Sequence, residues 1–165
     1  MIQASAIGWT QSTLNTTDNH MDILVDIDTL ADNSHRQHIL ENDPQDWTTF
    51  FEAMKDDEPI QPIVKLVRDL YYFDNSDYEI ILITGKPENF RDLTVKWLRK
   101  YKIPDDILYM RKHYDCRPDH VVKLELYQEI KKHFRPKLVI DNRQSVVDMW
   151  REQGLICLQM KDCTL

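Results

Sequence analysis

The stretch Asp22-Ile23-Leu24-Val25-Asp26-Ile27-Asp28 decides the fold, because it is an aliphatic run that closes on two carboxylates. Residues 22–27 are predicted to form a short buried strand. An Asp-x-Asp after such a strand places an acidic nucleophile and an acidic proton carrier at one strand end. Alone the pattern is weak, because strands commonly end in Asp or Asn for backbone reasons. Its meaning depends on the rest of the chain.

Other predicted strands end in a similar way. Residues 78–83 are followed by Thr84-Gly85-Lys86-Pro87, and residues 137–141 lead into Asn142. Short strands are also predicted at 107–110 and 155–159. Helical spacing predicts helices at 43–55, 59–73, 88–101, 118–133 and 144–153. Aliphatic strands that alternate with helices are typical of a parallel sheet covered on both faces. We therefore expect an α/β fold, a three-layer Rossmann-like parallel sheet with helices on both faces.

Ligands of such sheets bind beyond the carboxyl ends of the strands, where the strand order reverses. This rule is expected to bring together six polar or small residues that come from three distant segments: Asp26, Asp28, Thr84, Gly85, Asp141 and Asn142. The separate weak motifs thereby become one predicted site.

The order of these motifs, with a lysine on the helix before the last one, resembles the haloacid dehalogenase superfamily of Mg²⁺-dependent phosphohydrolases. Within that superfamily the chain is similar to the 3′-phosphatase domain of phage polynucleotide kinase, over about residues 22–159. The most specific stretches are Arg117-Pro-Asp-His-Val-Val-Lys123 and Ile140-Asp-Asn-Arg-Gln-Ser-Val-Val-Asp-Met-Trp150. The chain has no Gly-x-x-x-x-Gly-Lys-Ser/Thr phosphate loop, so the resemblance does not extend to the kinase part.

The resemblance implies a two-step phosphoryl transfer. Asp26 would attack phosphorus and become an aspartyl phosphate, and Asp28 would carry the proton. Thr84 would bind the phosphate oxygens, and Lys123 would neutralise the nucleophile and the transferred group.

The resemblance also implies a Mg²⁺ site. The carboxylates of Asp26 and Asp141 and the backbone carbonyl of Asp28 would hold the ion. Asn142 stands where the family usually has a second acid, so it would keep a metal-bound water in place but add no charge. A second departure is that Thr29-Leu30 follows Asp28 where the family usually has Gly-Thr.

Substrate binding is expected from residues close to these motifs: Gly85, Lys86, Arg111 and Arg117. The alternatives are an ordinary turn at Thr84-Gly85 and a solvated charged loop around residue 111. The aromatic stripe Trp47, Phe50, Phe51 is expected to pack in the core or to form a small cover over the site, with base stacking as an alternative.

The substrate depends on how open the site is. Roughly thirty residues separate the first motif from the helix at residue 59, too few for a large cap domain. An open site favours the 3′-phosphate of a nucleic-acid end. The alternatives are a nucleoside monophosphate phosphatase and an inactive phosphate-binding module.

Composition sets the remaining expectations. A chain of 165 residues with 42% hydrophobic content can form one domain. We predict an irregular extension at 1–20 and a phosphatase domain at 21–165. The net charge of −7 argues against a general nucleic-acid coat protein. Three cysteines without metal-ligand spacing indicate a cytoplasmic protein, in the host cytoplasm if phage-encoded. The lack of a long apolar run indicates that the chain does not cross a membrane. We infer no obligate protein partner.

Overall fold

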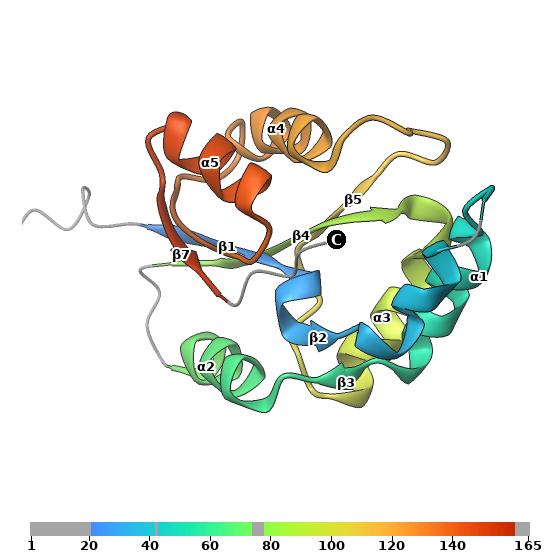
Figure 1. The fold of residues 1–165 in the computed structure, drawn as a ribbon. Helices are drawn as coiled ribbons and strands as arrows, with labels where there is room; N and C mark the ends of the chain where they lie inside the picture. The colour runs from blue at the N-terminus through green and yellow to red at the C-terminus, as the bar shows by residue number, and fades with distance from the viewer. Residues whose placement is uncertain (1–20, 42, 74–77, 161–165) are drawn as a thin grey trace, which may run out of the picture.

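The computed structural model describes residues 21–41, 43–73 and 78–160, so the extension predicted at 1–20 lies outside the described residues. A five-stranded sheet with the order β5-β4-β1-β6-β7 forms the centre of the molecule (Figure 1). Every neighbouring pair in this sheet is parallel. Its strands are β1 (Asp22–Asp26), β4 (Ile80–Pro87), β5 (Leu108–Arg111), β6 (Pro136–Asp141) and β7 (Ile156–Gln159).

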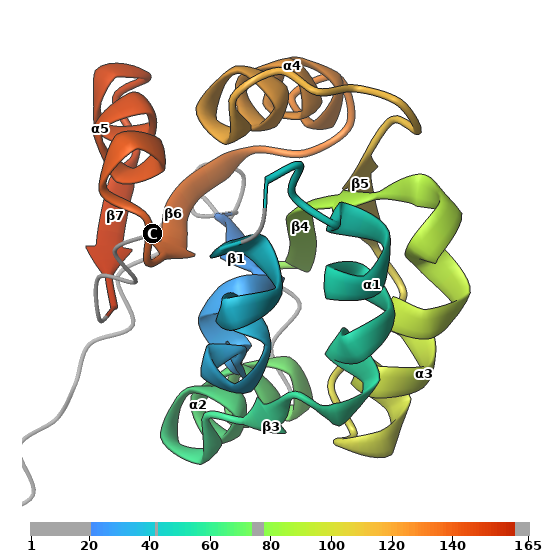
Figure 2. The same cartoon turned by 45° about the vertical axis from the view of Figure 1, so that its right-hand side comes forward.

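Helices cover both faces of the sheet (Figures 1 and 2). The helices α2 (Gln61–Tyr72) and α3 (Arg91–Lys100) pack on one face, in a core that includes Val25 and Trp97. The helices α4 (Asp119–Ile130) and α5 (Gln144–Glu152) pack on the other, in a core that includes Leu24 and Trp150. Neighbouring residues of β1 point to opposite faces, which is why the strand is apolar throughout. The predicted three-layer α/β fold is confirmed.

The strand order reverses beside β1. The chain runs from β1 outward through β4 to β5 and then returns to β6 on the other side of β1. Asp26 pairs with Ile83 of β4, and Val25 pairs with Ile140 of β6. The carboxyl ends of these three strands therefore meet at one edge of the sheet.

The segment between β1 and α2 forms a small cover. It contains the 3₁₀ helices η1 (Ile27–Leu30), η2 (Ser34–Glu41) and η3 (Ala53–Asp56), the short helix α1 (Trp47–Glu52), and an antiparallel pair of β2 (Ala31–Asp32) and β3 (Glu58–Pro59). Arg36 is buried and donates to both carboxylate oxygens of Asp57, at 2.7 and 2.8 Å, which ties η2 to the residue after η3. A large cap domain has no room in this segment.

Two local predictions are wrong. The helix expected at 43–55 begins only at Trp47, because Asp46 caps it by accepting a hydrogen bond from the backbone N–H of Thr49. The strand predicted at 78–83 is β4, which begins at Ile80 and runs to Pro87, so Thr84-Gly85 lies within a strand and not in a turn. An irregularity in the register with β5 allows Pro87 to pair with Arg111 there.

Among the helices of the described ranges, none combines the length and the apolar character that crossing a bilayer requires.

Candidate active site

The floor of the site is a buried cluster of charges around Lys123. Its Nζ lies 2.8 Å from Asp26 Oδ1, 2.9 Å from Asp141 Oδ2 and 3.4 Å from Asp119 Oδ2. The side chains of Lys123, Asp26 and Asp141 are at most 2% exposed. Burial lowers the pKa of the Lys123 ammonium, but Asp119, Asp141 and Asp26 outweigh it and raise this pKa well above its ordinary value. Lys123 therefore stays charged and joins the ends of β1 and β6.

Asp26 ends β1 and caps η1. Its Oδ2 accepts hydrogen bonds from the backbone N–H and the hydroxyl of Thr29, at 3.1 and 3.2 Å. Burial raises the pKa of Asp26 to about 7 against the attraction of Lys123, and the nearby carboxylates Asp141, Asp28 and Asp119 add to the rise. Thr29, which follows the unusual first motif, thus contacts the predicted nucleophile directly.

Asp28 lies on η1, two residues after Asp26, and forms an ion pair with Lys86 of β4. Burial acts to raise the pKa of Asp28, but the charge and hydrogen bond of Lys86, together with Arg36 and Lys123, hold it well below its usual range. Asp28 and Lys86 both line the main pocket of the described structure.

Asp119 begins α4 and was not singled out from the sequence. It lies four residues before Lys123 on one helical face, and Arg111 Nη2 donates to its Oδ1 at 3.2 Å. A Cβ atom on Gly85 would come within 2.0 Å of this same oxygen. Residue 85 therefore has to be glycine for the carboxylate to approach β4 this closely. The i, i+4 spacing of Asp119 and Lys123 was the available signal.

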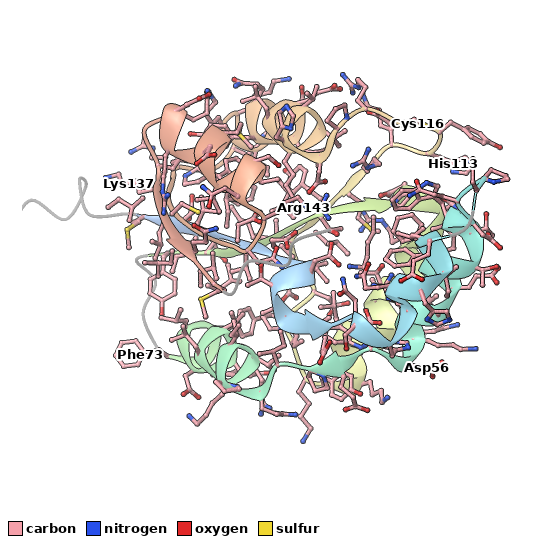
Figure 3. The ribbon with its side chains drawn as sticks, in the orientation of Figure 1. Asp56, Phe73, His113, Cys116, Lys137 and Arg143 are labelled. Atoms are coloured by element: carbon pink, nitrogen blue, oxygen red, sulfur yellow. The ribbon has the colours of Figure 1, made fainter. Side chains whose placement is uncertain are left out.

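The pocket opens above this cluster and has a volume of about 650 Å³. Figure 3 shows Arg143 near the centre of the molecule, and His113 and Cys116 on the loop between β5 and α4. Arg143 lines the pocket with a side chain that is 43% exposed, and it forms a long ion pair with Asp119, with 3.9 Å between Nη1 and Oδ2. It is therefore a more available cation than the arginines predicted from the sequence.

Those two arginines line the pocket but are engaged elsewhere. Arg111 donates to the backbone carbonyls of Gly85, Asp115 and Arg117 and thereby holds the loop on β4. Arg117 forms ion pairs with Asp115 and Glu125. A substrate would have to compete with these partners.

Thr84 lies beneath the pocket instead of in its wall. It is fully buried, and its hydroxyl oxygen accepts a hydrogen bond from the backbone N–H of Lys86, at 3.1 Å. Gly85 and Lys86, which follow it on β4, do line the pocket.

The oxygen atoms fit the expected Mg²⁺ ion, which prefers hard oxygen ligands. Asp26 Oδ1 is buried, and among the described residues its polar contact is the ion pair with Lys123. Asp141 is more engaged. Its Oδ1 accepts from the backbone N–H groups of Asn142 and Arg143, and its Oδ2 accepts from Lys123 and from Trp150 Nε1.

Asn142 is buried, and within the described residues hydrogen bonds are recorded for its backbone only. Its side chain is therefore a further oxygen donor at the end of β6. Across the described ranges, no three His, Cys, Asp or Glu side chains are arranged to hold a metal. The expected set does not need three, because it combines two carboxylates with a backbone carbonyl.

Comparison with known proteins identifies the family of the chain. Residues 20–164 match the family described as the polynucleotide kinase PNKP phosphatase domain. A chain of the Pnkp1/Rnl/Hen1 complex is 26% identical, with a TM-score of 0.70 over 96% of the present chain and 53% of that one. A chain in the structure of the Pnkp1/Rnl/Hen1 RNA repair complex is 25% identical, with a TM-score of 0.69 over 99% of the present chain and 48% of that one. The present chain thus spans about half the length of these relatives.

A Class C acid phosphatase from Bacillus anthracis is similar in fold. It is 14% identical, with a TM-score of 0.64 over 90% of the present chain and 69% of that protein. At this identity the likeness concerns the fold alone.

Proposed function

Since the chain belongs to the polynucleotide kinase phosphatase-domain family of haloacid dehalogenase phosphatases, we propose that it removes 3′-phosphates from nucleic-acid ends with the help of Mg²⁺. The observation that carries this proposal is the position of Asp26. Its carboxylate is buried at the carboxyl edge of the sheet, its Oδ1 is held 2.8 Å from Lys123, and Asp28 lies two residues further on in the pocket wall.

The first step forms a covalent intermediate. The ionised carboxylate of Asp26 attacks phosphorus, and the bond between phosphorus and the sugar oxygen breaks. The leaving oxygen takes a proton from Asp28. Lys86 favours the ionised form of Asp28, so Asp28 first takes up a proton, from solvent or from a monoanionic substrate phosphate, when that phosphate draws Lys86 away from the carboxyl group.

The second step restores the enzyme. Asp28, now ionised, takes a proton from a water molecule that attacks the aspartyl phosphate. The bond between Asp26 and phosphorus breaks, and inorganic phosphate leaves. Lys123 remains charged throughout and balances the negative charge of Asp26 and of the transferred group.

The residues that would hold Mg²⁺ are Asp26, Asp141, Asn142 and the backbone carbonyl of Asp28. When bound, the ion offsets the repulsion between the nucleophile and the phosphate and orients the phosphate. The pKa of about 7 for Asp26 supports this role, because a cation beside Asp26 Oδ1 would favour the ionised form that attacks.

A polymer end is favoured as the substrate for two reasons. The segment between β1 and α2 is a small cover and leaves a pocket of about 650 Å³. One similar solved structure is an RNA repair complex, so RNA ends should be among the substrates. The rival is a nucleoside monophosphate.

A phosphate-release assay tests the proposal. The protein with Mg²⁺ is given oligonucleotides with a 3′-phosphate, oligonucleotides with a 5′-phosphate, or free mononucleotides. We expect release mainly from the 3′-phosphorylated DNA or RNA, and loss of that release on chelation or in Asp26→Asn. Preference for mononucleotides would favour the nucleotidase, and release by folded Asp26→Asn at the parent rate would contradict the covalent mechanism.

A further inference from the structure

The pocket above Asp28 has a second end that the proposed chemistry does not use. Six aromatic side chains line it, three from α1, one from η4 (Glu88–Phe90) and two from the loop between β5 and α4: Trp47, Phe50, Phe51, Phe90, His113 and Tyr114. Figures 1 and 2 show that α1 lies beside α3 and that the loop extends from α4, so the aromatic residues come from two different parts of the fold.

The rings of α1 and η4 form a row. The Trp47 ring is stacked with Phe51 at a centroid distance of 5.9 Å, and Phe51 contacts Phe90 at 5.3 Å. Trp47 nevertheless remains 48% exposed. Phe51 and Phe90 hold the row in place, and the exposed part of the Trp47 ring faces the pocket.

The opposite side is built differently. The ring of Tyr114 lies 3.6 Å from that of His113 and is 86% exposed. His113 Nδ1 is hydrogen-bonded to Asn89 Oδ1 at 2.7 Å, which joins the loop to η4. An exposed tyrosine on a loop that is fixed in this way is available to a ligand.

The two ends of the pocket match two parts of one ligand. Lys86 and Arg143 line the pocket where they contact Asp28 and Asp119, and they suit a phosphate, whereas the aromatic end offers flat apolar surfaces. We propose that the aromatic end, with Trp47 and Tyr114 foremost, stacks on the nucleobase of the nucleotide whose phosphate is removed. This inference rests on the proposed function and adds a base-binding subsite to it.

Stacking explains why this subsite is aromatic. Every nucleobase has a flat face, so stacking binds bases without selecting their sequence, and loss of one stacked ring weakens binding by about tenfold or more. A loss of 1.4 kcal/mol corresponds to about a tenfold loss of affinity. An enzyme that acts on the ends of varied sequences would gain affinity in this way.

The test compares two 3′-phosphorylated oligonucleotides that differ only in whether the terminal nucleotide carries a base or is abasic. We expect Trp47→Ala and Tyr114→Ala each to raise KM about tenfold for the base-bearing substrate. They should change KM little for the abasic one, on which the parent already has a raised KM. Trp47→Phe and Tyr114→Phe should retain most of the affinity. Tyr72→Ala is the matched control, because Tyr72 is 67% exposed at the end of α2 and does not line the pocket.

Binding to the Asp26→Asn variant keeps the inference testable without turnover. Fluorescence anisotropy with the same two oligonucleotides, and with a 3′-mononucleotide as competitor, should show tighter binding of the base-bearing ligands, lost on adding Trp47→Ala. Equal affinity of the parent for base-bearing and abasic ligands would overturn the subsite. So would equal losses on both ligands in Trp47→Ala and Tyr114→Ala. Absence of phosphate release from every oligonucleotide, with base-dependent binding intact, would instead contradict the proposed function alone.

Discussion

At the scale of single residues, Asp26 is under two opposing demands. A carboxylate that attacks phosphorus has to be ionised, but burial favours its protonated form and raises its pKa to about 7. Lys123 at 2.8 Å opposes this effect only in part. Ionisation of the buried Asp26 carboxyl group therefore destabilises the folded protein at neutral pH, and a bound cation would offset this effect.

This cost predicts a pH-dependent gain in stability for Asp26→Asn. Burial raises the pKa of Asp26 from its ordinary value of 3.8 to about 7 in the folded protein, so between these pH values the folded state holds a proton that the unfolded state releases. The stability of the parent due to this group is therefore highest below pH 4, falls as the pH rises to 7 and stays low above.

The asparagine side chain of the Asp26→Asn variant does not ionise between pH 4 and 7. The difference in free energy of unfolding between Asp26→Asn and the parent should grow in favour of the variant from pH 4 to 7, by at most about 1.4 kcal/mol for each pH unit. Urea unfolding with chelator at several pH values measures it. Asp148→Asn, at an exposed position, serves as the control. A difference that stays constant with pH would contradict the origin proposed for the raised pKa.

Asn142 leads to a second prediction. Its side chain supplies an oxygen but no charge at the end of β6, so Asn142→Asp should bind Mg²⁺ more tightly. The Mg²⁺ concentration for half-maximal phosphate release should fall several-fold.

The control for this variant is Gln144→Glu, which adds the same charge two residues further on at an exposed position. An unchanged or higher Mg²⁺ requirement for Asn142→Asp, or an equal fall in both variants, would remove Asn142 from the proposed metal site.

At the scale of elements, the close approach of β4 and α4 assembles the site. Gly85 lies on β4, and Asp119 begins α4, which also carries Lys123. Because a Cβ at position 85 would lie 2.0 Å from Asp119 Oδ1, the Asp119 carboxylate can lie this close to β4 only beside a glycine. The same contact positions Arg111, which bonds both Gly85 and Asp119.

Gly85→Ala should therefore damage activity more than stability. The added methyl would displace the Asp119 carboxylate, which lies 3.4 Å from Lys123, and we expect kcat to fall at least about tenfold. Phosphate release and thermal unfolding measure the two effects.

The matched glycine is Gly154, which follows α5 at a φ of 81° with open space around its Cβ position. Gly154→Ala should cost about 1 kcal/mol of stability through backbone strain and leave kcat unchanged. Parent-like kcat in Gly85→Ala would show that the position of Asp119 does not matter for turnover.

At the scale of the whole molecule, ligand binding and folding are linked. An ion that binds only the folded protein stabilises it, by about 2.7 kcal/mol at a hundred times its Kd. We therefore expect Mg²⁺ to raise the melting temperature at pH 8, and Asp26→Asn to lose most of this rise. NaCl at the same ionic strength is the control, since it screens charge without occupying the site. An equal rise with both salts would leave no specific binding to explain.

The sequence alone determined the parallel sheet, its helices on both faces and the edge at which Asp26, Asp28 and Asp141 meet. The periodicity of strands and helices can be read from short stretches of sequence. Because ligands bind at the carboxyl ends of parallel strands, the order of these elements also predicts the position of the site. The family membership followed from the same motifs. The division at residue 20 remains a prediction.

Only the tertiary structure decided which charges are free. Arg111 donates hydrogen bonds to backbone carbonyl groups, and Arg117 forms ion pairs with carboxylates. Arg143, in contrast, has a partly exposed side chain in the pocket. It also showed Trp47 to be partly exposed in that pocket and not buried in the core. The physical reason is that hydrogen-bond partners and solvent exposure depend on groups distant in sequence, which come into contact only when the layers pack.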